Sequence, residues 1–408
     1  MGTPDPPYPG REETFRAFAE RVSRGKVRTF EAYGLDVVMG ERSGATFSDA
    51  FDGRRFLDCH CNGGVFNLGH RHPAVLRAVR EALDRVDIGN HHLVSGWRAR
   101  LAERLCASTG GLMAGAVFGS GGGEAVDLAL KVARGVTGRR RVVSALGGYH
   151  GHTGLAVAAG DAQYREPFGA SSPDFVQVPF DDLPAMAAAV DGATAAVILE
   201  PIPATLGMPI PRPGYLAGVG ALCRERGARL VIDEVQTGLG RTGRMWAFQH
   251  DGLAPDAVVV GKGLSGGVYP ITATLLTAEL KAFLDDRPFA HVSTFGGAEP
   301  GCAAALAVLD VVESPGFLER VVAVSDRLAA GLAGLPFELR RRGLMMGLRF
   351  PAEGAGFMAA KLMFDAGVFC LPANNDTSVL QLLPPLVIGD GEVEELLRQV
   401  KGIFGGLA

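Results

Sequence analysis

The segment Val258–Gly263 places a lysine directly after an apolar run. Three valines precede Gly261 and Lys262, which is the pattern of a strand buried on both faces. Because burial of an ammonium group is costly, a lysine at such a strand end is unusual. Desolvation would lower the pKa of Lys262 and make its amine a nucleophile toward a carbonyl carbon. For a lysine taken alone, the ordinary alternative is a side chain that reaches out to solvent.

A second apolar run, Leu230–Ile232, leads straight into two carboxylates, Asp233 and Glu234. A carboxylate at a strand end in a cleft can pair with the ring nitrogen of a cationic heterocycle and keep that nitrogen protonated. Asp233 fits this role. A helix cap or a solvated turn is the alternative for an aspartate taken alone.

A glycine-rich stretch, Gly119–Gly123, precedes a helical pattern that begins near Glu124. Glycines let the backbone approach an anion, and free N–H groups in the first turn of a helix favour phosphate. A nucleotide-binding P-loop would need Gly-Lys-Ser/Thr at this point, where the chain has Glu124. The stretch therefore favours a phosphate monoester, although many such turns are only tight connections. Together with Lys262 and Asp233, it supplies the parts that a pyridoxal phosphate site needs.

The stretch Gly238–Gly243 also matches the GxGxxG fingerprint of dinucleotide-binding proteins. Arg244 and a segment that contains glycine and proline follow it in place of a clean amphipathic helix. No second strand ending in an acidic residue stands at the expected distance, since the next strand ends at Lys262. We therefore do not expect a nicotinamide cofactor.

Short apolar runs alternate with helical or glycine-rich segments through the middle of the chain. Continuous apolar strands are buried on both faces, so they predict a largely parallel sheet with helices on either side. From about residue 311, a helix, two short strands and a final helix predict a smaller α+β domain. The runs that carry the sheet prediction are 142–143, 195–199, 228–232, 257–260 and 272–276, and the later strands are expected near 344–350 and 379–383.

The bulk composition limits the partners and the compartment. With 408 residues and a net charge of −4, the chain offers no reason to expect nucleic acid or an anionic membrane as a partner. No apolar stretch approaches the roughly 18 residues of a spanning helix, and the N-terminal residues lack the basic-then-apolar pattern of a signal peptide. We therefore expect a cytoplasmic protein. The six cysteines are scattered, and Cys59-His60-Cys61 matches no common zinc spacing, so we expect no metal site.

These motifs resemble the class III aminotransferase family, the group of ornithine and 4-aminobutyrate aminotransferases. The resemblance runs from Asn67–Pro73 to Leu383–Leu386 and is most specific at Asp233–Gly238, Gly240–Gly243 and Gly261–Gly267. It implies an α/β protein of pyridoxal phosphate fold type I. In that fold a mostly parallel seven-stranded sheet, flanked by helices, forms a large domain, and both termini build a smaller α+β domain.

The domain boundaries expected from this resemblance lie near residues 60 and 310. Residues 1–60 would form an N-terminal arm and part of the small domain, and residues 61–310 the large cofactor-binding domain. Residues 311–408 would form the C-terminal small α+β domain. The first 12 residues contain four prolines and few apolar side chains, which predicts an arm that is mobile or lies over a partner.

The resemblance also assigns roles to individual residues. It implies that Lys262 forms a Schiff base with pyridoxal 5'-phosphate and then moves a proton at the substrate Cα, and that Asp233 pairs with the pyridinium nitrogen. Thr294 would reach the phosphate of the neighbouring subunit, which implies a homodimer with a shared active site. The remaining cofactor contacts would be the backbone of Gly121, Gly122 and Gly123, the side chains of Val235 and Tyr149 on the two ring faces, and Gln236 at the ring hydroxyl.

Two positions differ from the residues usual in the family, and a third residue loses its usual partner as a result. Gln381 replaces an arginine that usually binds the substrate carboxylate, and His152 replaces a second arginine found in the glutamate-specific subgroups. Glu200 would normally pair with the first of these. Loss of one partner of a buried charge pair costs roughly 2–5 kcal/mol, so we expect no ordinary glutamate site unless Arg98 or Arg165 has taken over the carboxylate. Glu200, His152 and Gln381 are therefore candidate substrate residues.

Two hypotheses for the reaction follow. The first is an aminotransferase that acts on an unusual amine or amino acid in a specialised biosynthetic pathway, with a keto acid as the other small-molecule substrate. The second keeps the cofactor but changes the outcome at Cα to decarboxylation, oxygen-dependent oxidative decarboxylation (a monooxygenase) or racemisation. A non-enzymatic scaffold would be expected to lack Lys262 or Asp233, and both are present.

Overall fold

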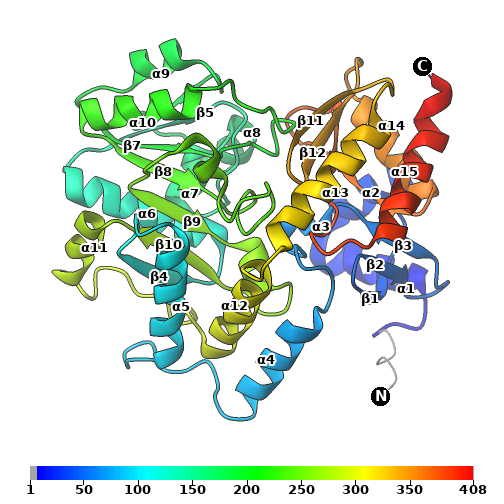
Figure 1. Ribbon diagram of the computed structural model, residues 1–408, viewed down its shortest axis with the longest axis horizontal. Coiled ribbons are helices and arrows are strands. Elements are labelled where there is room, and N and C mark those ends of the chain that lie inside the picture. Colours follow the sequence, from blue (N-terminus) through cyan, green and yellow to red (C-terminus); the bar gives the residue numbers. More distant parts are fainter. Residues whose placement is uncertain (1–6, 408) are drawn as a thin grey trace.

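Seven strands form the central sheet of the molecule, in the order β4-β10-β9-β8-β7-β5-β6 (Figure 1). The structure, a computed structural model, describes residues 7–407. Only β10 runs antiparallel to its neighbours in this sheet, so the predicted mostly parallel seven-stranded sheet is confirmed. The strands are β4 (Gly115–Gly119), β5 (Arg141–Ala145), β6 (Phe175–Val178), β7 (Thr194–Leu199), β8 (Arg229–Asp233), β9 (Ala257–Val260) and β10 (Thr272–Leu276).

Alternate residues of these strands feed two separate cores. On β9, Val259 packs with helix α6 (Gly122–Thr137), whereas Val258 and Val260 pack on the opposite face. Successive side chains of a strand point to opposite sides, and helices cover both sides of this sheet, so both faces are buried. The other helices around this sheet are α4 (Pro73–Leu83), α5 (Gly96–Ser108), α7 (Gly154–Ala159), α8 (Ala162–Arg165), α9 (Leu183–Ala189), α10 (Tyr215–Arg226), α11 (Ala278–Asp285) and α12 (Glu299–Val312), with 3₁₀ turns at Glu166–Phe168, Ala247–Asp251 and Lys262–Ser265.

A second lobe contains both ends of the described chain (Figure 1). Its two four-stranded sheets have the orders β1-β2-β3-β13 and β11-β12-β15-β14. Strand β13 pairs in parallel with β3, which joins an N-terminal segment to a C-terminal one. The strands are β1 (Met39–Ser43), β2 (Thr46–Asp49), β3 (Arg55–Asp58), β11 (Glu338–Arg342), β12 (Met345–Arg349), β13 (Val368–Phe369), β14 (Leu371–Pro372) and β15 (Val379–Leu382).

The helices of this lobe pack around those two sheets. They are α1 (Arg11–Phe18), α2 (Arg24–Ala32), α3 (Cys61–Gly64), α13 (Phe317–Leu332), α14 (Ala355–Asp365) and α15 (Asp390–Phe404), with a π-helical segment at Ala19–Ser23 and a 3₁₀ turn at Gly405–Leu407. Half of the predicted arm, residues 1–6, lies outside the described residues, and α1 already begins at Arg11. We keep the division at residues 60 and 310 as a proposal.

No single helix within residues 7–407 is both long enough and apolar enough to cross a membrane. Taken together, α12 and α13 have the length and composition of a span, but the pair is bent by 68° at its break.

Arg241, inside the GxGxxG stretch, links the two lobes. Its side chain is fully buried, and its guanidinium donates to the backbone oxygens of Leu344 (3.1 Å) and Pro384 (2.6 Å) and to Oδ1 of Asn67 (2.7 Å). Through these contacts of Arg241, the turn stabilises the packing of the two lobes.

Replacement of Arg241 by alanine should lower the free energy of unfolding by roughly 3 kcal/mol, because three buried acceptors lose their donor. A shift in the urea midpoint would measure the loss. Arg398→Ala, which removes an exposed arginine from α15, should change the free energy of unfolding by less than about 0.5 kcal/mol. Equal shifts for the two variants would contradict this function of Arg241.

Candidate active site

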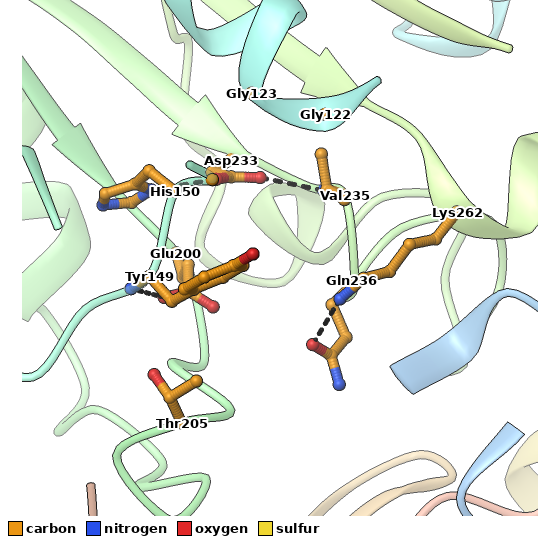
Figure 2. A pocket seen from close by; sticks show the side chains of 11 residues that line it. Gly122, Gly123, Tyr149, His150, Glu200, Thr205, Asp233, Val235, Gln236 and Lys262 are labelled. Carbon is orange, nitrogen blue, oxygen red and sulfur yellow. Dashed lines mark hydrogen bonds and ion pairs between the residues drawn. The ribbon is translucent and has the colours of Figure 1, made fainter. Parts of the chain in front are cut away.

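A cavity of ≈ 620 Å³, counted to its open mouth, lies at the carboxyl ends of the parallel strands (Figure 2). Asp233 ends β8, Glu200 directly follows β7, and Lys262 follows β9 after a single glycine. The carboxyl ends of parallel strands meet at one edge of a sheet, which is where such folds bind ligands. The lining residues are Gly122, Gly123, Tyr149, His150, Gly151, Glu200, Thr205, Asp233, Val235, Gln236 and Lys262.

Asp233 is buried and held in place from two sides. Its Oδ2 lies 2.9 Å from Nδ1 of His150, and its Oδ1 accepts the backbone N–H of Val235 at 3.1 Å. Burial lowers the pKa of His150, but the hydrogen bond to Asp233 and the charges of Asp233 and Glu200 outweigh burial, so the net pKa is raised. The imidazole therefore orients the carboxylate. We did not identify His150 from the sequence, where its only signal is its place between Tyr149 and Gly151.

Lys262 combines an unusual backbone with a perturbed amine. Its φ of +43° lies in the left-handed region that favours glycine, and such strain is typical of functional sites. Burial lowers the pKa of its amine, and the charges of Glu200 and Asp233 only partly offset this. Nζ donates to Oε1 of Gln236 at 2.8 Å (Figure 2). A Cβ placed on Gly63, in α3, would lie 3.4 Å from Nζ, so the α3 segment closes over the lysine.

Glu200 carries a carboxylate with few partners. Its side chain is 8% exposed, and Oε1 accepts the backbone N–H of Tyr149 at 3.0 Å. Burial raises the pKa of Glu200 to about 7, and the nearby His150 lowers it only in part. No ion pair within residues 7–407 neutralises this carboxylate at closer than 4 Å, so it is available to a ligand.

The glycine turn forms a narrow wall of the cavity at the start of α6 (Figure 2). A Cβ on Gly123 would lie 2.6 Å from Oγ1 of Thr153, so only glycine fits there without a shift. Glu124 accepts the backbone N–H of Ser120 at 2.8 Å and fixes the turn. The first N–H groups of a helix have no partner inside it and attract anions. This cradle, Asp233 and the amine of Lys262 share one cavity and fit pyridoxal phosphate.

Other residues predicted from the sequence lie outside this lining. Gly121 precedes α6 and lines an adjoining cavity with Gly122 and Lys262. The ring of His152 lies edge-on to Tyr149 at 5.2 Å, and Thr294 is exposed. Gln381 is buried in β15, where its Nε2 donates to the backbone oxygen of Pro372 at 3.2 Å.

The two arginines considered as substitutes also lie outside the lining. Arg98 donates through Nε to the backbone oxygen of Gly297 at 2.9 Å, and Arg165 through Nη1 to that of Gly160 at 3.4 Å. Lys262 is thus the one cationic Lys or Arg side chain among the residues that line this cavity in the described part of the chain.

Comparisons with known proteins agree with this site. The family model for class III aminotransferases matches residues 31–404. An uncharacterized aminotransferase from Archaeoglobus fulgidus is 49% identical over 399 residues, which cover 96% of this chain and 94% of that protein. The ornithine aminotransferase of Toxoplasma gondii ME49 superposes with a TM-score of 0.89 at 27% identity, over 98% of this chain and 96% of that one.

A PLP-bound amine transaminase from an uncultivated Pseudomonas species is also similar, with a TM-score of 0.83 and 27% identity over 91% of this chain and 95% of that one. These relatives share the fold type I architecture, and none of them supports the alternative of decarboxylation, oxidation or racemisation. The family match spans nearly the whole chain and includes the strands that carry Asp233 and Lys262. The chain therefore belongs to the class III aminotransferase family, and pyridoxal phosphate is its cofactor.

Proposed function

We propose that this enzyme transfers the amino group of an amine or amino acid whose reacting end is not held by an arginine. The observation that carries the proposal is the charge of the cavity lining, which has two carboxylates, Glu200 and Asp233, against the one amine of Lys262. Binding a dicarboxylate there would leave at least one anionic group without a bidentate partner. A donor with a second positive charge or a hydroxyl group, by contrast, matches Glu200.

The cofactor would be held by residues from three segments. The backbone of Gly122 and Gly123 would bind its phosphate, and Asp233 would bind its ring nitrogen. The side chains of Val235 and Tyr149 would cover the two ring faces, with Gln236 at the ring hydroxyl and Gly121 supporting the turn. Pyridoxal phosphate, when bound, supplies an electron sink for the carbon next to the substrate nitrogen.

Lys262 would act on the proton at that carbon. Its lowered pKa increases the fraction of the amine in the neutral form, which is the form that can accept a proton. The hydrogen bond to Gln236 holds Nζ at one side of the cavity, and the α3 segment limits its movement. Glu200 would bind the far end of the substrate, while His152 and Gln381 stay candidate substrate residues.

A half-reaction screen tests the proposal. Purified holoenzyme mixed with a diamine or amino alcohol should lose the visible absorbance band of its cofactor, and a keto acid should restore that band. Glutamate should act far more slowly. The proposal is wrong if glutamate is the best donor, or if no amine changes the spectrum.

The pH dependence of the donor KM tests Glu200. Because burial raises the pKa of Glu200 to about 7, its carboxylate is ionised above that pH and largely neutral below it. The KM for a diamine should fall as the pH rises through about 7, and Glu200→Gln should remove this fall and raise KM roughly tenfold at pH 8. A monoamine of similar length is the control, since its KM should change little in the variant.

We further propose a homodimer with a shared active site. Thr294 is exposed, and exposed apolar side chains gather in the adjacent segments 93–97 and 289–295, including Val94 and Phe289. The rings of His92 and Phe289 lie 6.3 Å apart, which brings these segments together. An exposed apolar patch of this kind is typical of an interface. Cytoplasmic location stays a prediction.

A further inference from the structure

A second cavity, of ≈ 880 Å³, shares no lining residue with the candidate active site. It lies between the end of β1, the turn before α4, and α4 itself. Its lining residues are Arg42, Ser43, Arg71, Pro73, Leu76, Arg77, Arg80, Glu81 and Asp84. Four arginines and two carboxylates make the lining net positive, although the whole chain has a net charge of −4.

The arginine side chains of this cavity have few hydrogen-bond or ion-pair partners within residues 7–407. Arg42 donates to the backbone oxygens of Gly40 and Met39, at 3.2 and 3.3 Å. The side chains of Arg71, Arg77 and Arg80 are exposed, and within residues 7–407 they make no hydrogen bond or ion pair. Guanidinium groups gathered without counter-charges repel one another, so an anion among them is stabilising.

Nearby carboxylates do not neutralise these arginines, although the spacing would allow it. Glu81 follows Arg77 by four residues, and Asp84 follows Arg80 by four. At the same spacing in α11, Lys281 pairs with Asp285 at 2.6 Å. The guanidinium groups of α4 are therefore not held in ion pairs along their own helix.

The backbone at Arg71 is held in a strained conformation. Its φ is +53°, which is uncommon for a residue other than glycine and persists only where the surroundings enforce it. Here Gly44 and His70 exchange two backbone hydrogen bonds, of 3.1 and 2.7 Å, and His70 contacts the buried Asp58 at 2.9 Å. A Cβ on Gly69 would lie 2.6 Å from the backbone oxygen of Gly44, so the two turns are in tight contact. Arg71 is therefore fixed beside the cavity before any ligand binds.

We propose that this cavity binds the phosphate group of a phosphorylated small molecule. A phosphate monoester carries a charge of about −1.5 to −2 at pH 7, which balances the net charge of this lining. Arginine forks bind phosphate oxygens in pairs, and the cavity volume lies within the range of small-molecule sites. The site is separate from the cofactor's phosphate cradle, and its failure would leave the proposed transaminase function unaffected.

Calorimetric titration of the holoenzyme tests the site, because the cradle at the start of α6 is then already filled. Inorganic phosphate and glycerol phosphate serve as separate probes, and tighter binding of glycerol phosphate would identify a phosphorylated molecule, and not free phosphate, as the ligand. The double variant Arg77→Ala/Arg80→Ala should weaken binding of either probe at least about tenfold. Glu81→Gln/Asp84→Asn should instead strengthen it, since two like charges are removed.

A matched control removes the same charge elsewhere. Arg28→Ala/Arg398→Ala takes away two exposed arginines that do not line the cavity, and it should leave the phosphate Kd within about twofold. Equal weakening in the two arginine variants would overturn the proposal, as would wild-type protein that binds neither probe. Sedimentation of each variant distinguishes a second outcome: if loss of Arg77 and Arg80 dissociates an oligomer, these arginines face another subunit and the proposal is wrong.

Discussion

Lys262→Ala should reduce the rate of transamination by at least about 10⁴-fold, while the protein still folds. General acid–base assistance alone contributes up to about this factor, and the variant also loses the nucleophilic amine. The substitution shortens a side chain that lines a cavity. The hydrogen bond that it removes is the one to Gln236, so a small change in the free energy of unfolding is expected. Half-reaction kinetics with the best amine donor would measure the effect.

Covalent attachment provides a second measurement of Lys262. After borohydride reduction, mass spectrometry of the wild-type protein should find the cofactor on the peptide that contains Lys262, and the variant should carry none. Lys281→Ala, which removes a surface lysine paired with Asp285, should keep both the attachment and the activity. Retention of the cofactor on another lysine with normal turnover would contradict the assignment.

Asp233→Asn should lower kcat by about 30- to 4,000-fold. This range corresponds to the roughly 2–5 kcal/mol that loss of one member of a buried charge pair costs. The asparagine keeps the shape and can still bond to His150, so the change removes mainly the charge that would keep the ring nitrogen of the cofactor protonated. Stopped-flow spectra of the half-reaction would show the slow step directly.

Glu234 offers a matched control for Asp233. It is the next carboxylate in the chain and is equally buried, but it accepts hydrogen bonds from Thr237 at 2.5 Å and from the backbone of Phe248 at 2.8 Å, outside the cavity lining. Glu234→Gln should lower stability with little change in kcat. If the two variants lose kcat equally, the effect comes from packing and the proposed role of Asp233 is wrong.

Parts of the fold were predictable because their signals are local. Five of the central strands were identified as continuous apolar runs, which is what burial on both faces requires. Strands β4 and β6 were missed. Strand β4 has a run of only three apolar residues, 116–118, between two glycines, and β6 is an edge strand whose apolar residues are interrupted by Gln177.

Helix limits in the C-terminal half were less accurate. The sequence predicts a helix from about residue 311, whereas α12 still runs to Val312 and α13 begins at Phe317 after Gly316, whose φ is +82°. A left-handed glycine sets the direction of the new helix relative to α12, and that angle depends on how the two lobes pack. Helix α12 is buried through most of its length and shows no clear polar face in the sequence.

The sequence by itself indicated the cofactor and marked Lys262 and Asp233 as the candidates to bind it. Lys262 and Asp233 follow buried parallel strands, and the carboxyl ends of such strands meet at one edge without further information. Only the tertiary structure paired His150 with Asp233, 83 residues away, and placed Glu200 in the cavity with no ion pair to another side chain of residues 7–407. It also showed Arg241 as a link between lobes and gathered the arginines of α4 and β1 around a second cavity. The reason is physical: strand burial is encoded by neighbouring residues, whereas the partner of a charged side chain depends on which distant segments the fold brings within hydrogen-bonding distance.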